Sequence, residues 1–237
     1  MAVESKTFPG GAGTPVPAIR FPLRSLAIPD TYQRYFTWAQ IIVVFLSLEF
    51  SLWTPVPGGR NRWIVITMLA VLLFVLVDRP SLERLGLRLP KTFGASVVLG
   101  ISFAAAILMV LAVRWAGGVI RPNPTWPNLH LAWQYLVWAM IQEFMLQSFF
   151  FTRFERLFEG TTAVWASATL FAVAHLPSPI LTTFTLIGAL FFCEMFRRYR
   201  SIYPIGIVHA LLGLTVSVTM PNNLLHHMRV GFGYLRF

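Results

Sequence analysis

The sequence predicts an all-α membrane protein, a bundle of about seven transmembrane helices. Two observations predict this fold class. Of the 237 residues, 56% are hydrophobic and only 12% are charged, whereas a soluble domain has about 25% charged residues. The apolar residues also gather into runs close to the roughly 20 residues that a helix needs to cross a bilayer. This composition excludes an ordinary water-soluble globule and also a disordered chain.

Seven apolar segments can be placed along the chain after an N-terminal stretch, residues 1–34. That stretch contains five prolines and no long apolar run, so we expect an irregular cytoplasmic tail and not a signal peptide. The segments lie near Tyr35–Trp53, Trp63–Val77, Ala95–Trp115, Asn128–Phe151, Thr161–His175, Pro179–Phe196 and Ile202–Met220. We expect three supporting helices within residues 35–127, a four-helix core within 128–220 and a short tail over 221–237.

The distribution of basic residues predicts the orientation in the membrane. When the segments alternate across the bilayer, 13 of the 19 Lys and Arg residues fall on the side of the N-terminus. The positive-inside rule then places the N-terminus in the cytoplasm and the C-terminus outside. The net charge of +10 is divided among the loops, so lipid headgroups, and not nucleic acid, are the expected partners. We expect a multi-pass protein of a bacterial inner membrane.

Ionisable residues within the apolar segments are few, and each is a candidate for function because a charge at mid-membrane costs about 2.5–3.5 kcal/mol. They are Glu49, Glu143, His175, Glu194 and His209. Glu49 and Glu194 lie near segment ends, where an interfacial or ion-paired carboxylate is the simpler interpretation. The other three lie on different segments, and we expect them to meet in one site between helices.

A carboxylate and two imidazoles support two kinds of chemistry. A desolvated Glu can act as general base for water, while one His orients that water and a second donates to an oxyanion. The same three groups could instead ligate zinc, although their spacing does not resemble the zinc-binding His pair of a single helix. We therefore expect no cofactor, with zinc as the weaker alternative. The single cysteine, Cys193, excludes an intramolecular disulfide framework and is expected to be a buried packing residue.

Three short motifs within about residues 130–220 resemble those of the CAAX protease and bacteriocin-processing (CPBP) family of intramembrane proteases. Gln142, Glu143 and Gln147 occupy the places of its EExxxR motif, Phe171 and His175 match FxxxH, and His209 and Gly213 occupy those of a His followed four residues later by Asn or Asp. The resemblance implies that the first Glu and the second-motif His activate water, and that the third motif binds the oxyanion. It also implies a membrane-embedded or membrane-anchored protein substrate.

Three positions depart from the motifs of this family. Gln142 replaces the first Glu, Gln147 replaces the Arg, and Gly213 replaces the Asn or Asp. Glutamine cannot accept a proton from water, so Glu143 is the remaining carboxylate of the first motif. We expect Gln142 and Gln147 to position neighbouring groups by hydrogen bonds, and Gly213 to allow close helix packing.

Together these observations predict a glutamate-type intramembrane endopeptidase. Glu143 is the predicted base, His175 its assistant in activating water, and His209 the group at the oxyanion. The substrates would be membrane-anchored proteins or peptides, including those with C-terminal sorting signals or lipid anchors. An inactive CPBP-like protein that serves as an immunity, binding or assembly factor stays open as an alternative, because Gln142 and Gly213 stand at chemical positions. A proton-coupled transporter is opposed by the absence of two similar halves.

Overall fold

The computed structural model describes residues 30–120 and 129–236, and every regular element in these ranges is helical. The long elements are α1 (Asp30–Trp53), α2 (Gly59–Asp78), α3 (Thr92–Trp115), α4 (Leu129–Glu143), the π-helix η1 (Phe144–Phe151), α5 (Thr152–Leu157), α6 (Gly160–Val173), α7 (Pro179–Tyr199) and α8 (Ile202–Thr219). Short elements follow: α9 (Asn222–Leu225), the 3₁₀-helix η2 (His226–Met228) and α10 (Phe232–Leu235). The predicted all-α class is confirmed. Most of the predicted N-terminal tail lies outside the described residues, and α1 already begins at Asp30.

The seven predicted segments coincide with helices or with one continuous run of helices. Five helices, α1, α2, α3, α7 and α8, are long and apolar enough to cross a membrane. The fourth segment, predicted over Asn128–Phe151, corresponds to α4 and η1, and α5 continues the same helical run beyond its predicted end. The fifth corresponds to α6, an apolar helix of only 14 residues. The chain is therefore an integral multi-pass membrane protein, and the number of spans stays a prediction.

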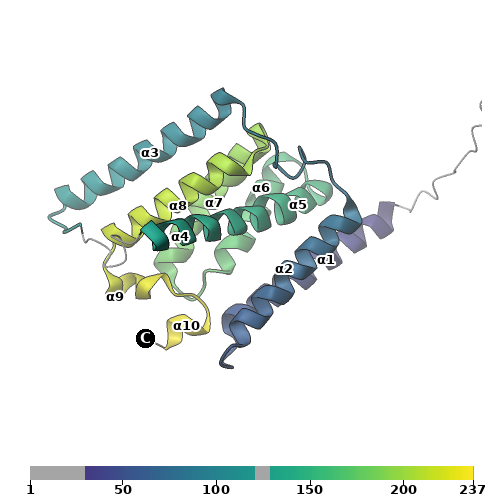
Figure 1. Cartoon of the computed structure of the whole chain (residues 1–237), viewed down its shortest axis with the longest axis horizontal. Helices are drawn as coiled ribbons and strands as arrows, with labels where there is room; N and C mark the ends of the chain where they lie inside the picture. The colour runs from purple at the N-terminus through teal and green to yellow at the C-terminus, as the bar shows by residue number, and fades with distance from the viewer. Residues whose placement is uncertain (1–29, 121–128, 237) are drawn as a thin grey trace, which may run out of the picture.

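The helices form a bundle with α4 and α8 near its centre (Figure 1). Helices α1 and α2 make an antiparallel hairpin along one side, and α3 packs on α8 along the other. Behind α4 and α8, α6 and α7 pack against each other. The three motifs lie on α4 with η1, at the end of α6 and on α8, and this arrangement brings those helices together in the middle of the molecule.

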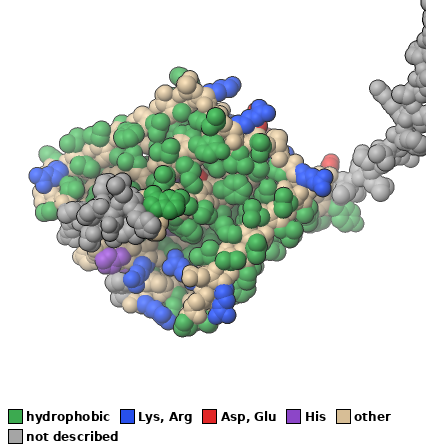
Figure 2. All heavy atoms as spheres, viewed as in Figure 1, with side chains coloured by type: hydrophobic (Ala, Val, Ile, Leu, Met, Phe, Trp, Pro, Cys, Tyr) green, Lys and Arg blue, Asp and Glu red, His purple; other side chains and the backbone are tan. Residues whose placement is uncertain are grey.

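The outer surface of the bundle is apolar. Figure 2 shows hydrophobic side chains over most of one face, with Lys and Arg toward its edges. On α2 and α3, large apolar side chains point outward, among them Leu73 and Leu108, which are 59% and 65% exposed. Soluble monomers rarely expose apolar patches of this extent. These helices are therefore suited to contact with lipid.

Two glycines on one face of α8 allow α4 to approach closely. A Cβ atom on Gly206 would lie 2.3 Å from the sulfur of Met140, and one on Gly213 would lie 2.1 Å from the hydroxyl oxygen of Tyr135. Both distances are shorter than real contacts of a Cβ atom. Small residues commonly permit such close packing between membrane helices. Because His209 lies between the two glycines in sequence, this packing also brings its backbone close to α4.

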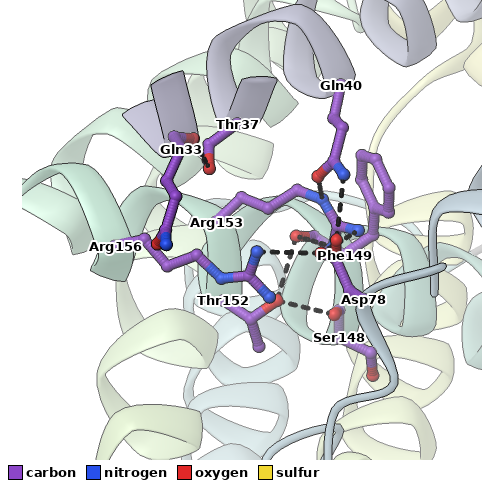
Figure 3. A network of polar contacts seen from close by, with 9 residues as sticks. All are labelled: Gln33, Thr37, Gln40, Asp78, Ser148, Phe149, Thr152, Arg153 and Arg156. Atoms are coloured by element: carbon purple, nitrogen blue, oxygen red, sulfur yellow. Dashed lines mark hydrogen bonds and ion pairs between the residues drawn. The ribbon is translucent and has the colours of Figure 1, made fainter. Parts of the chain in front are cut away.

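A buried polar network joins the α1–α2 hairpin to the core (Figure 3). Arg153 of α5 is 1% exposed, and its guanidinium carbon lies 3.7 Å from the centre of the Phe149 ring. It donates hydrogen bonds to Gln40 Oε1 at 2.6 Å and to Asp78 Oδ2 at 3.1 Å. Arg156 forms a second ion pair with Asp78, at 2.8 Å. One carboxylate at the end of α2 is thus shared by two cations of α5.

The Asp78→Asn substitution is expected to lower the free energy of unfolding by about 3–5 kcal/mol, because it leaves the buried Arg153 charge without its counter-ion. Thermal unfolding in detergent measures the effect. The matched control is Glu83→Gln, which breaks the exposed ion pair with Arg88 (69% and 63% exposed) and should change little. Equal melting temperatures for the two variants would contradict a structural role for the network.

When successive segments cross the membrane in alternate directions, the chain segments after α2, within α5 and after α7 lie on the same side. In the structure these segments meet at one end of the bundle. Asp78, at the end of α2, pairs with Arg153 of α5. Arg200, just after α7, pairs through both terminal nitrogens with Glu155 of α5. These contacts agree with the alternation used in counting the basic residues, while the orientation of the bundle stays a prediction.

Candidate active site

A cavity of about 410 Å³ is lined by residues of every helix from α1 to α8 except α5, and of η1, and is bordered by the segment around Met228 and Val230. Most of its lining is apolar. Its polar or ionisable lining residues are Arg60, Tyr135, Gln142, His175, Thr185 and His209. Within the described ranges, no Asp or Glu lines it. The cavity therefore collects two of the three ionisable residues predicted for the site, and the third lies behind its wall.

Glu143 is that third residue, and it is fully buried, with no exposed surface. Its Oε1 lies 2.7 Å from His209 Nδ1, and its Oε2 accepts a hydrogen bond of 3.0 Å from Gln147 Nε2. When Glu143 is ionised, its carboxylate only accepts hydrogen bonds, and His209 Nδ1 is then the donor in the first contact. Both oxygens are thus occupied by protein groups. The placement favours holding His209 over direct contact with water.

His209 projects from α8 between aromatic rings. It stacks on Phe192, with ring centres 5.5 Å apart, and lies edge-on to Phe171 at 6.0 Å. A neutral imidazole has one donor and one acceptor nitrogen. Because Nδ1 donates to Glu143, Nε2 is the acceptor left for the cavity. Its rotation is restricted by the Glu143 bond and by both rings.

His175 lies just beyond the end of α6 and is fixed in a similar way. Its Nδ1 is 2.7 Å from the carbonyl oxygen of Phe171, which can only accept, so Nδ1 carries the proton. The ring also packs against the Phe171 ring, with centres 4.7 Å apart. In the neutral side chain, Nε2 is again the acceptor. Phe171 therefore contacts both histidines, through its ring and its backbone.

Gln142 lines the cavity, although its neighbour Glu143 does not. Consecutive residues of an α-helix point about 100° apart, so the two side chains take different sides of α4. Among the described residues, the Gln142 amide has no hydrogen-bond partner. The structure thus brings Gln142, His175, Phe171, His209 and Gly213 to one cavity. The predicted role of Glu143 as base stays untested, and its burial disfavours it.

The described residues contain no group of three His, Cys, Asp or Glu side chains placed to hold a metal ion. Glu143, His175 and His209, the ligands of the weaker zinc alternative, are not grouped in that way, and that alternative stays untested. Both Glu143 oxygens already accept hydrogen bonds.

The remaining ionisable residues singled out in the sequence lie outside the cavity lining. Glu194 pairs with Arg197 at 2.7 Å and with Arg198 at 2.6 Å, which is the ion-paired arrangement expected for it. Glu49 accepts a hydrogen bond from the Trp53 indole at 2.9 Å. Cys193 is buried.

Sequence reasoning missed three polar residues of the cavity, Tyr135, Thr185 and Arg60. Tyr135 precedes Gln142 by seven residues, a spacing that places both on one face of a helix. That spacing was an available signal. Arg60 belongs to no motif, and its sequence context marks it only as one of the basic residues between apolar segments.

Comparison with known proteins identifies one relationship. Residues 124–215 match the Rce1-like family, described as type II CAAX prenyl endopeptidase Rce1-like. No curated protein and no solved structure matches the chain. The matching region runs through α4 into α8 and contains Gln142, Glu143, His175 and His209, so the resemblance to CPBP proteases is confirmed over this region.

Proposed function

We propose that this chain, whose residues 124–215 match the Rce1-like family of CAAX prenyl endopeptidases, is an intramembrane endopeptidase that cleaves membrane-anchored proteins or peptides. At the level of the family, the match supports a CAAX-type protease. One observation carries the proposal for this chain: two imidazoles line the same cavity, and each already donates its Nδ1 proton to a fixed acceptor. Two acceptor nitrogens are therefore left to hold and deprotonate a water molecule.

The proposed reaction begins with a water that donates to Nε2 of His175 and of His209. As its oxygen forms a bond to the substrate carbonyl carbon, one proton passes to His209. Glu143 stabilises the imidazolium that forms, as a buried carboxylate does for a His base. The tetrahedral intermediate then collapses, the carbon–nitrogen bond breaks, and the imidazolium returns a proton to the leaving amine. No metal or cofactor takes part in these steps.

This assignment moves the role of base from Glu143 to His209 and gives Glu143 the role of holding His209. Glu143 has no surface on which water could bind, whereas His209 lines the cavity. The oxyanion then needs another donor. The Gln142 amide lines the same cavity and can supply a hydrogen bond. A glutamine at this position is compatible with hydrolysis when the base is an imidazole.

The test uses the full chain in proteoliposomes with two synthetic probes, a peptide with a C-terminal prenylated CAAX sequence and a peptide anchored by a transmembrane helix. Mass spectrometry follows cleavage by wild type and by His209→Ala. We expect wild type to cleave at least one probe and the variant to leave both intact while unfolding at a similar temperature. Equal product from both proteins would refute the proposal.

A second candidate is a non-catalytic binding protein on the same scaffold. The observation that favours it is the absence of any carboxylate from the cavity lining of the described residues. The Gln142→Glu variant separates the two functions. If wild type binds the probes without cleaving them and Gln142→Glu cleaves them, the natural protein is a binding protein.

Arg60 supports a substrate with a negative group near one end of the cavity. It lies in the first turn of α2, lines the cavity and has no ion-pair partner among the described residues. A free C-terminal carboxylate is the anionic group that every peptide can supply. With the predicted orientation, this end of the cavity faces the outside, which suits substrates that have already been translocated.

The Arg60→Gln substitution is expected to raise KM about 10-fold or more for a probe with a free C-terminal carboxylate, because a charged hydrogen bond contributes about 1.5–3 kcal/mol. The same probe with an amidated C-terminus should show no change. Arg62→Gln is the matched control, since Arg62 is exposed, as Arg60 is, but does not line the cavity. Equal effects on the free and amidated probes would show that Arg60 does not bind the carboxylate.

A further inference from the structure

We propose that Tyr135 is a further catalytic residue of this cavity and that its hydroxyl donates a hydrogen bond to the oxyanion formed on the substrate carbonyl. The inference rests on the proposed hydrolytic function. It assigns a role to a residue that belongs to none of the three motifs.

The position of the hydroxyl is defined by its contact with Gly213. A Cβ atom on Gly213 would lie 2.1 Å from the Tyr135 hydroxyl oxygen and 3.0 Å from the ring carbon that bears it. The hydroxyl therefore occupies the space into which any side chain at position 213 would project. Gly213 follows His209 by four residues, which places the two about one turn apart on the same face of α8. Tyr135, His209 and Gly213 all line the same cavity.

Within the described residues, the Tyr135 hydroxyl has no hydrogen-bond partner. The walls around it are mostly apolar. The side chain is half-buried, so its hydroxyl is open to the cavity. A hydroxyl with no protein partner there is free to donate to a group that binds in the cavity.

The polar groups of the cavity show which kind of group this is. Nε2 of His175 and of His209 are acceptors, so they bind the water and cannot donate to an oxyanion at the same time. The Thr185 hydroxyl already donates to a carbonyl of its own helix. Three uncharged donors of α4, the Tyr135 hydroxyl, the Trp138 indole and the Gln142 amide, line the cavity and share one face of the helix. Among them, the Tyr135 hydroxyl is the one held against Gly213 of α8, one turn from His209. Donors and acceptors in one cavity match the needs of a water and the carbonyl that it attacks.

The test is Tyr135→Phe, which removes only the hydroxyl. In the proteoliposome assay we expect kcat to fall about 10²–10³-fold, the usual effect of losing one oxyanion donor, while KM changes less than about threefold because the hydroxyl acts on the transition state. The matched control is Tyr203→Phe. The Tyr203 hydroxyl donates to the Leu87 carbonyl at 3.2 Å and does not line the cavity. Its loss should lower the melting temperature and leave kcat unchanged.

The two proposals can fail separately. If wild type cleaves the probes and Tyr135→Phe retains its kcat, or changes only KM, the role of Tyr135 is refuted and the protease stands. If Tyr135→Phe lowers kcat and the melting temperature together, as a packing defect would, the role is also refuted. If wild type and His209→Ala give the same products, the proposed function fails, and the role of Tyr135 fails with it.

Discussion

Replacing Glu143 by glutamine is expected to lower kcat for peptide hydrolysis about 10⁴-fold, the effect of the same exchange at a buried carboxylate that orients a His base. The amide has nearly the size of the carboxylate, so the protein should stay folded. It no longer stabilises an imidazolium, and its NH₂ group can donate to Nδ1 of His209 and leave the proton on the wrong nitrogen. Single-turnover cleavage in proteoliposomes measures the loss, and thermal unfolding in detergent serves as the control for folding.

The double variant Glu143→Gln/His209→Ala shows whether Glu143 acts through His209. Groups that work as a unit are strongly non-additive, so the double variant should be no slower than His209→Ala alone. A double variant that is slower by the full product of the two single losses would mean that Glu143 acts on water by itself. The role of base first predicted for Glu143 would then be restored.

Replacing His175 by alanine is expected to lower kcat about 10²–10⁴-fold, the range contributed by a positioned proton acceptor. The variant removes one of the two nitrogens that hold the water. Phe171→Leu is the matched control, because it keeps the backbone carbonyl that binds His175 and changes only the ring; we expect it to lose less than tenfold.

The outcome for His175 also separates two arrangements of the water. If His175→Ala retains most of its activity while His209→Ala has none, the water is held by His209 alone. Restored hydrolysis on adding free imidazole to His175→Ala would support a direct role in proton transfer, since a purely structural defect is not repaired by the missing ring.

Most of the fold could be predicted because hydrophobic runs report directly on membrane-spanning helices. The seven segments correspond to the observed helices, including α7, which begins at Pro179 as predicted. The meeting of His175 and His209 at one cavity was also anticipated, since ionisable residues within apolar helices face one another or a polar space. The number of spans is less accessible from sequence, because α6 has only 14 residues.

The details of the site were less predictable because they depend on which way a side chain points. Gln142 and Glu143 are neighbours, and hydrophobic periodicity does not show which of them faces the cavity. The role of Tyr135 was hidden for another reason. An aromatic residue in an apolar helix is usually a packing residue, and its contact with Gly213 joins positions far apart in the chain.

The π-helical segment η1, which begins directly after Glu143, has a consequence for comparing related sequences. A π turn contains more residues than an α turn because its hydrogen bonds run from i to i+5. A relative lacking one residue between Phe144 and Phe151 could close this stretch as ordinary α-helix and rotate α4 by about 100° relative to α5. Residues that align in the two sequences would then occupy different positions in space. An acidic residue aligned with Glu143 would line the cavity in one protein and lie behind its wall in the other. A single-residue gap downstream can thus decide which of two adjacent motif positions performs chemistry.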